Sequence, residues 1–143
     1  MKLSTNGRYA VRAMLDLAQH YKNGLVLAKD VARRQGISER YLEHLLISLK
    51  TEGLIKSVRG AHGGFSLTKP PDKIKLIDII RVSEGPLVLV ECVVDAGVCP
   101  RSSKCAIRDV WSELQSAMTD VLSSKTLQDL IERQQSKEQS SAI

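Results

Sequence analysis

Three glycines within the six residues Arg59–Gly64 constrain this chain more than any other local feature. The segment separates two short apolar stretches, Ile55–Val58 and Phe65–Thr68, which have the composition of strands. Because glycine adopts a positive φ without steric cost, this segment can reverse the chain within a few residues. The sequence therefore predicts a β-hairpin, which Pro70-Pro71 closes.

Three helices are predicted ahead of this hairpin. Apolar residues recur at helical spacing from Thr5 to Tyr21, over Ala28–Gln35, and from Glu39 to about Glu52. The short turn Gln35-Gly36-Ile37-Ser38 sets the last two helices at a steep angle, and its serine caps the third helix. Three helices followed by a glycine-rich hairpin are the order of a winged helix-turn-helix. The predicted fold is mainly α, with the hairpin as a small β wing.

A fourth helix, an irregular segment and a long helix are predicted to follow. The fourth helix covers about Leu76–Ser83, and the stretch Leu87–Lys104 has poor periodicity. A long C-terminal helix from Cys105 to about Ser123 carries a broad apolar stripe and is interpreted as a dimerisation helix; a short helix, Thr126–Arg133, follows. The predicted organisation is a winged head at 1–84, a cysteine-bearing loop at 85–104, dimerisation helices at 105–133 and a flexible, Gln- and Ser-rich tail at 134–143.

Positive charge is concentrated in the front of the chain. Residues 1–82 hold 15 Lys and Arg against seven Asp and Glu, whereas residues 83–143 hold six against nine. A basic front half next to a mildly acidic rear half indicates that the front half binds a polyanion. The order of its elements, three helices followed by a hairpin, indicates that this polyanion is double-stranded DNA.

The predicted DNA contacts lie on the third helix and on the hairpin. Arginine can pair with guanine through two hydrogen bonds, glutamate can accept from the cytosine amine, and a basic glycine loop can follow phosphates or enter a minor groove. A solvated polar face is the alternative for any one of these residues. The candidates are Arg8, Ser38, Arg40, Tyr41, Glu43, His44, Arg59, Gly60 and His62.

Cys92, Cys99 and Cys105 are the chain's only cysteines, and all three fall within 14 positions. Free thiols, one disulfide with one thiol, a zinc site and an iron–sulfur cluster all remain open. The odd count argues against a structural disulfide, and zinc sites usually have tighter C-x2-C pairs. Thiolate-rich sites with looser spacing suit an iron–sulfur cluster, which normally takes four ligands.

The sequence resembles the iron–sulfur cluster regulator (IscR) family of bacterial winged-helix repressors. The resemblance covers about residues 1–133. It is carried by the start Met1-Lys2-Leu3-Ser4-Thr5 with Gly7-Arg8-Tyr9, by Ile37-Ser38-Glu39-Arg40-Tyr41-Leu42-Glu43, by Gly53-Leu54-Ile55, by Arg59-Gly60-Ala61-His62-Gly63-Gly64-Phe65 and by the cysteine loop.

The resemblance implies a homodimer that is joined by the long helix and binds a palindromic operator. It implies a cluster, of the 2Fe-2S type, held by the three cysteines, iron–sulfur assembly proteins as its donors, and cluster-assembly genes as targets. Cluster binding would order the loop and bias the head toward one DNA-competent arrangement. Two alternatives within the same resemblance are a nitric-oxide-sensing cluster regulator and a cluster-free regulator of cysteine metabolism that acts through a partner protein.

The fourth cluster ligand is not evident from the resemblance. Relatives place a histidine three residues after the third cysteine, or an acidic residue in the first helix, and the matching positions here are Arg108 and Arg8. The gap between the first two cysteines is also one residue longer than expected. Nearby oxygen donors, with no preference among them, are Glu91, Asp95 and Asp109.

Other classes of function find little support in the sequence. There is no C-x-x-C pair, phosphate-binding loop or acid–base pair of the kind that enzymes use, so an enzyme is not expected. No apolar run approaches the roughly 20 residues that span a bilayer, and the N-terminus does not resemble a signal peptide. We therefore expect no membrane association and a cytoplasmic protein.

Overall fold

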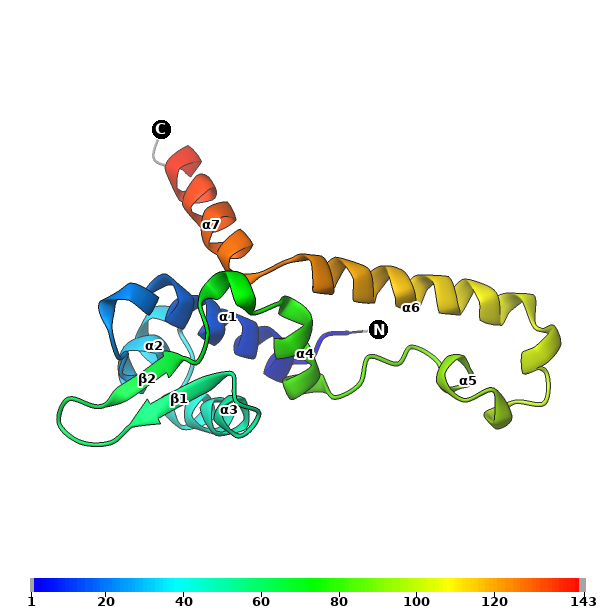
Figure 1. Ribbon diagram of the computed structural model, residues 1–143, viewed down its shortest axis with the longest axis horizontal. Helices are drawn as coiled ribbons and strands as arrows, with labels where there is room; N and C mark the ends of the chain where they lie inside the picture. The colour runs from blue at the N-terminus through cyan, green and yellow to red at the C-terminus, as the bar shows by residue number, and fades with distance from the viewer. Residues whose placement is uncertain (1, 142–143) are drawn as a thin grey trace.

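The computed structural model describes residues 2–141, which form a helical head with a long arm (Figure 1). Seven α-helices and one two-stranded antiparallel sheet account for most of these residues. Their bounds are α1 Thr5–Gln19, α2 Ala28–Gln35, α3 Glu39–Thr51, β1 Ile55–Val58, β2 Gly64–Leu67, α4 Leu76–Glu84, α5 Glu91–Val94, α6 Ala106–Ser124 and α7 Leu127–Ser141. The predicted fold class, mainly α with a β-hairpin wing and a long C-terminal helix, is confirmed.

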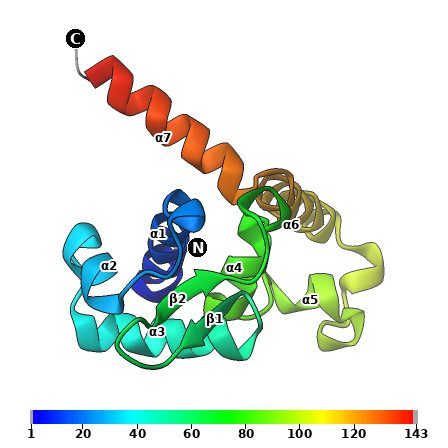
Figure 2. The same cartoon turned by 60° about the vertical axis from the view of Figure 1, so that its left-hand side comes forward.

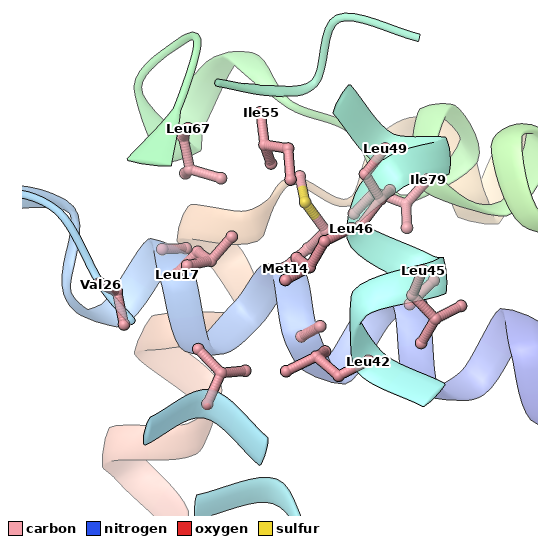
Figure 3. Packing of buried hydrophobic residues seen from close by; sticks show 14 of the residues in the cluster. Met14, Leu17, Val26, Leu42, Leu45, Leu46, Leu49, Ile55, Leu67 and Ile79 are labelled. Carbon is pink, nitrogen blue, oxygen red and sulfur yellow. The ribbon is translucent and has the colours of Figure 1, made fainter. Parts of the chain in front are cut away.

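The core of the head forms where α1 crosses α3 beneath the hairpin (Figure 3). Met14 and Leu17 on α1 meet a leucine stripe on α3, and Ile55 and Leu67 close the core from the hairpin. The α3 stripe consists of Leu42, Leu45, Leu46 and Leu49, each at most 3% exposed. Because burial stabilises each such side chain by about 1.5–3 kcal/mol, this aliphatic cluster is sufficient to hold three helices against a small sheet.

The predicted hairpin is present, with β1 at the predicted residues and β2 one residue earlier than predicted. Ile55 pairs with Leu67 and Val58 pairs with Gly64, so the second strand starts at Gly64 rather than at Phe65. Phe65 also forms an isolated bridge with Val26, and their backbone groups exchange hydrogen bonds of 2.9 and 2.7 Å. A side chain at Gly64 would collide with the Val26 backbone at 2.7 Å, which explains the glycine there.

The arm leaves the head after α4 and returns along α6 (Figure 1). Residues 87–104, predicted to be irregular, contain the four-residue helix α5 and short 3-10 turns at Ala96–Val98 and Ser102–Lys104. None of the 19 residues of α6 is buried in the single chain.

The last helix is longer than the sequence predicts. The sequence places its end at Arg133, whereas α7 continues to Ser141. The prediction of a flexible tail at 134–143 was therefore wrong for residues 134–141, which are helical, and residues 142–143 lie outside the described residues. The stretch contains no glycine or proline, and its i,i+4 pair Gln134–Glu138 forms a hydrogen bond of 3.1 Å.

The root of α7 belongs to the head. Leu127 is fully buried and Ile131 is 9% exposed within the head's core cluster. An antiparallel bridge between Lys75 and Thr126 brings the start of α4 beside the start of α7. Within residues 2–141, no helix is long and apolar enough to cross a membrane.

Candidate nucleic-acid interface and the cysteine segment

The turn between α2 and α3 has the geometry that a helix-turn-helix requires. Gly36 adopts the left-handed region at φ 64°, Ile37 is buried behind it, and the Tyr41 backbone N–H donates to Ser38 Oγ at 3.2 Å. Accepting this bond leaves the Ser38 hydroxyl proton free to donate elsewhere. The predicted cap at Ser38 is therefore present, and the side chain sits at the exposed start of α3.

The outer face of α3 is fully exposed and opposite to its leucine stripe. Arg40, Glu43 and His44, three of the predicted DNA contacts, lie on this face. Ile47 lies among them with 62% of its surface exposed, one helical turn after Glu43. Ile47 was not among the predicted contacts on α3, which were all sought among its polar residues. Its place opposite the leucine stripe was the signal that could have identified it.

Tyr41 is oriented inward, unlike the other predicted contacts on α3. Its hydroxyl donates to Asn6 Oδ1 at 3.1 Å, and its ring meets Tyr9 edge-on at 5.6 Å between centroids. Arg8, predicted as a contact from α1, is exposed, and its guanidinium donates to Thr5 Oγ1 at 3.2 Å. Tyr41 therefore braces α3 against α1, while Arg8 lies at the surface of the first turn of α1.

The hairpin tip carries the remaining predicted contacts. Arg59, Gly60 and His62 are all exposed. The tip is closed by the Gly63 N–H, which donates to Gly60 O at 3.0 Å, and a Cβ on Gly63 would overlap the Val58 carbonyl oxygen. An open groove separates the hairpin from the outer face of α3, lined from α3 by Glu43, Ile47 and Lys50 and from the sheet by Ser57 and Phe65. Of the predicted contacts, Glu43 lines this groove, whereas Arg59 and Gly60 line a second groove with Leu27, Ala28 and Glu39. In Figure 2 the hairpin and α3 lie next to each other.

A buried ion pair fixes the helix-turn-helix onto α1. Asp16 is 1% exposed and accepts from Arg34 Nε at 3.0 Å, from Arg34 Nη2 at 2.7 Å and from Gln35 Nε2 at 3.0 Å. The hydrogen bond to Asp16 raises the pKa of Arg34 above its ordinary value. Arg12 also reaches the end of α2, where it contacts the Gln35 backbone carbonyl. This ion pair was not predicted, although an aspartate inside the apolar face of α1 was a signal for it.

The three cysteines lie along the arm, away from the outer face of α3 (Figure 1). Cys92 lies in α5, Cys99 follows the turn Ala96–Val98, and Cys105 precedes α6; all three are free and partly buried. Across residues 2–141, no three side chains of His, Cys, Asp or Glu come close enough together to hold a metal ion. In this conformation the donor set therefore does not fit a cluster.

Arg108 has a structural partner in this segment. Its guanidinium Nε donates to the Cys92 backbone carbonyl at 2.8 Å, which ties the first turn of α6 to α5. The hydroxyl of Ser102 is buried with no hydrogen-bond partner between the last two cysteines. Arg108 therefore fixes the backbone between α5 and α6.

Comparison with known proteins identifies the family. The model of the Rrf2 family, described as an iron-dependent transcriptional regulator, matches residues 3–133. The chain belongs to the Rrf2 family. It is therefore a transcriptional regulator, and the resemblance to IscR-type regulators is confirmed.

Two kinds of Rrf2 regulator are about equally similar to this one. The regulator CymR of Bacillus subtilis is 42% identical over 130 residues, covering 91% of this chain and 89% of CymR. The regulator IscR of Photorhabdus laumondii is 38% identical over 135 residues, covering 94% of this chain and 82% of IscR.

The solved structures show the same division. The structure of CymR, the global cysteine regulator of B. subtilis, aligns at TM-score 0.79 with 42% identity, covering 91% of this chain and 95% of that one. The structure of T. potens IscR aligns at TM-score 0.76 with 43% identity, covering 93% of this chain and 88% of that one. Family membership therefore identifies the fold and the class of protein, a transcriptional regulator. It does not identify the signal to which the regulator responds.

Proposed function

We propose that this Rrf2 regulator binds a two-fold symmetric DNA operator, with α3 in the major groove and the hairpin along the neighbouring backbone. The observation that carries the proposal is the exposed face of α3 beside a basic, glycine-tipped hairpin. Arg40 and Glu43 lie exposed on that face, and Arg59 and His62 lie exposed at the tip of the hairpin. Arginine and glutamate have base-edge partners in the major groove, and the hairpin's cations suit phosphates.

We further propose that two chains associate through α6. A 19-residue helix with no buried residue leaves an apolar stripe in water, and a second copy of the same stripe would cover it. The exposed residues of the stripe are Ile107, Val110, Trp111, Leu114 and Val121. A two-fold dimer of this kind should bind half-sites that lie about one helical turn of DNA apart, roughly 34–36 Å.

The experiment that tests DNA binding first selects an operator from random duplexes with the wild-type protein. Fluorescence anisotropy then compares wild type with Arg40→Ala, and with Arg133→Ala on α7 as the control for a lost positive charge. Because a two-point contact to guanine contributes about 1–3 kcal/mol of discrimination, Arg40→Ala should weaken operator binding and relax the preference at one base pair of each half-site. Equal affinities for all three proteins would contradict the placement of α3, and failure to enrich any sequence would contradict operator binding.

For the signal, we propose that the cysteine segment is the sensor and that an iron–sulfur cluster is its ligand. Three partly exposed free thiols in one short segment of the arm support a thiolate ligand set. Loading would require the segment to rearrange, because its side chains do not gather in the present conformation. The similarity to CymR supports a second candidate, a regulator of cysteine metabolism that needs no cluster.

Anaerobic reconstitution with iron and sulfide separates these two candidates. If a cluster forms, the wild type should be coloured and should retain iron and sulfide in near-equal amounts after desalting. A variant with all three cysteines changed to serine should remain colourless under the same treatment. A colourless wild type that still binds its operator would rule out the cluster and leave the cluster-free candidate.

A further inference from the structure

The first turn of α1 is joined to the last turn of α4, far away in the sequence. The Ser4 backbone N–H donates to Glu84 Oε1 at 3.0 Å, and the Ser4 hydroxyl contacts the same oxygen. Gly7 is buried at this junction, and a Cβ on it would overlap Glu84 Oε1. Gly7 does not have a positive φ, so its backbone conformation does not require glycine. The close approach of the Glu84 side chain explains why a glycine stands here. Helices α1 and α4 lie side by side in both views (Figures 1 and 2).

Asn6 extends this junction to α3. Its Nδ2 donates to the Ser83 backbone carbonyl at 3.4 Å, and its Oδ1 accepts from the Tyr41 hydroxyl at 3.1 Å. A single amide therefore connects the end of α4 with the first turn of α3. The chain leaves the head for the cysteine segment directly after Ser83 and Glu84, so this bridge begins where the arm begins.

We propose that Asn6 is a positioning residue for DNA binding, which holds α3 in register with the end of α4 through Tyr41. The inference rests on the proposed function, because it assumes that the outer face of α3 meets DNA. Both hydrogen bonds of Asn6 are exposed, so water can replace them and the fold does not depend on them. What the bridge supplies is a fixed orientation of the start of α3, where Arg40 and Glu43 are placed. A change at the end of α4 thereby reaches α3 directly.

A double-mutant cycle on DNA affinity tests the proposal. The proteins are wild type, Asn6→Ala, Tyr41→Phe and the double variant, with Asn23→Ala at the turn Tyr21–Asn23 as the matched asparagine control. The probes are the selected operator and a random duplex, titrated over a series of salt concentrations, and thermal unfolding of each variant checks its fold. Each single variant should bind the operator about 3- to 10-fold more weakly, the effect of one net hydrogen bond. The double variant should be no weaker than the singles, because both changes remove the same bridge.

The double variant separates positioning from direct contact. If the Tyr41 hydroxyl bound DNA itself, Tyr41→Phe would still weaken the Asn6→Ala protein, and a phosphate contact would be lost on the random duplex as well. No variant of the cycle changes a charge, so the slope of log Kd against log salt should be the same for all of them. The proposal expects non-additive losses on the operator and unchanged binding to the random duplex. Additive losses, or operator affinity equal to wild type, would each overturn it. Wild-type protein that binds no operator would instead refute the proposed function.

For Glu84→Ala, the positioning model and simple electrostatics predict opposite changes in operator affinity. Removing a negative charge from a DNA-binding protein should tighten binding if only long-range electrostatics matter. The positioning model expects weaker operator binding, because the first turn of α1 is released from α4. Tighter binding would overturn the extension of the bridge to α4.

Discussion

At the scale of single residues, the head depends on one charged group that the core encloses. Asp16 lies among the apolar residues of α1, yet three donors from Arg34 and Gln35 satisfy its carboxylate. A buried carboxylate is tolerated only when it is paired and hydrogen-bonded in this way. Its partners join the end of α2 to α1, so the same interaction fixes the helix-turn-helix.

Asp16→Ala should therefore lower the free energy of unfolding by about 1–3 kcal/mol, because Arg34 and Gln35 lose their acceptor. Urea denaturation monitored by circular dichroism measures this change. Asp30→Ala is the control, since Asp30 makes only an exposed pair with Arg33 at 3.5 Å, and it should cost no more than about 1 kcal/mol. Equal losses for the two variants would show that the Asp16 pair is no stronger than a surface pair.

Asn6 and Asp16, which were not predicted, each have partners that are distant along the chain. Asn6 contacts residues 35 and 77 positions away, and Asp16 contacts Arg34 18 positions away. Periodicity, caps and turn residues are local signals, so they place a side chain on one face of a helix without identifying the residue that it contacts on another element. For the same reason the hydrogen bond of the Tyr41 hydroxyl to Asn6 on α1 could not be predicted.

At the scale of elements, local chemistry predicted the helix-turn-helix and α6 to within one or two residues, but not α5 or the end of α7. The bounds of α2 are as predicted, and those of α1, α3 and α4 differ by one or two residues, since caps and glycines mark their ends. Helix α5 has only four residues, too few to show a period. The end of α7 was misplaced because a polar composition was equated with absence of structure.

The prediction at this scale concerns dimerisation through α6. Because its apolar stripe is exposed in the single chain, placing charge on the stripe should prevent association while leaving the head folded. Val110→Arg is expected to sediment as a monomer in analytical ultracentrifugation and to lose most of its affinity for a palindromic operator. Asp120→Arg, on another side of the same helix, is the control and should remain dimeric. A dimeric Val110→Arg protein would place the interface elsewhere.

At the scale of the whole molecule, the hydrophobic core passes directly from α4 to α7. Ile80 and Leu127 are both buried, and among the residues between them Ser102 alone is buried in the single chain. The bridge between Lys75 and Thr126 holds the two sides of this excursion together. The long arm is therefore outside the core, although it occupies the middle of the sequence.

Leu127→Ala should consequently destabilise the head by about 2–5 kcal/mol, as expected for a truncated core leucine. Thermal or urea unfolding measures the loss, with Val94→Ala on α5 as the control, because that valine is 64% exposed and should change stability little. A small effect of Leu127→Ala would mean that α7 is not part of the folding unit.

The cysteine segment, residues 87–104, contributes almost nothing to the core and is free to diverge. Substitutions, insertions and deletions within it meet few packing constraints, whereas the helix-turn-helix remains under constraint from the leucine stripe and the Asp16 pair. Natural selection can thus change the signal that such a regulator senses without rebuilding its DNA-binding head. Regulators that respond to different signals can then arise from one ancestral head by changes confined to this segment.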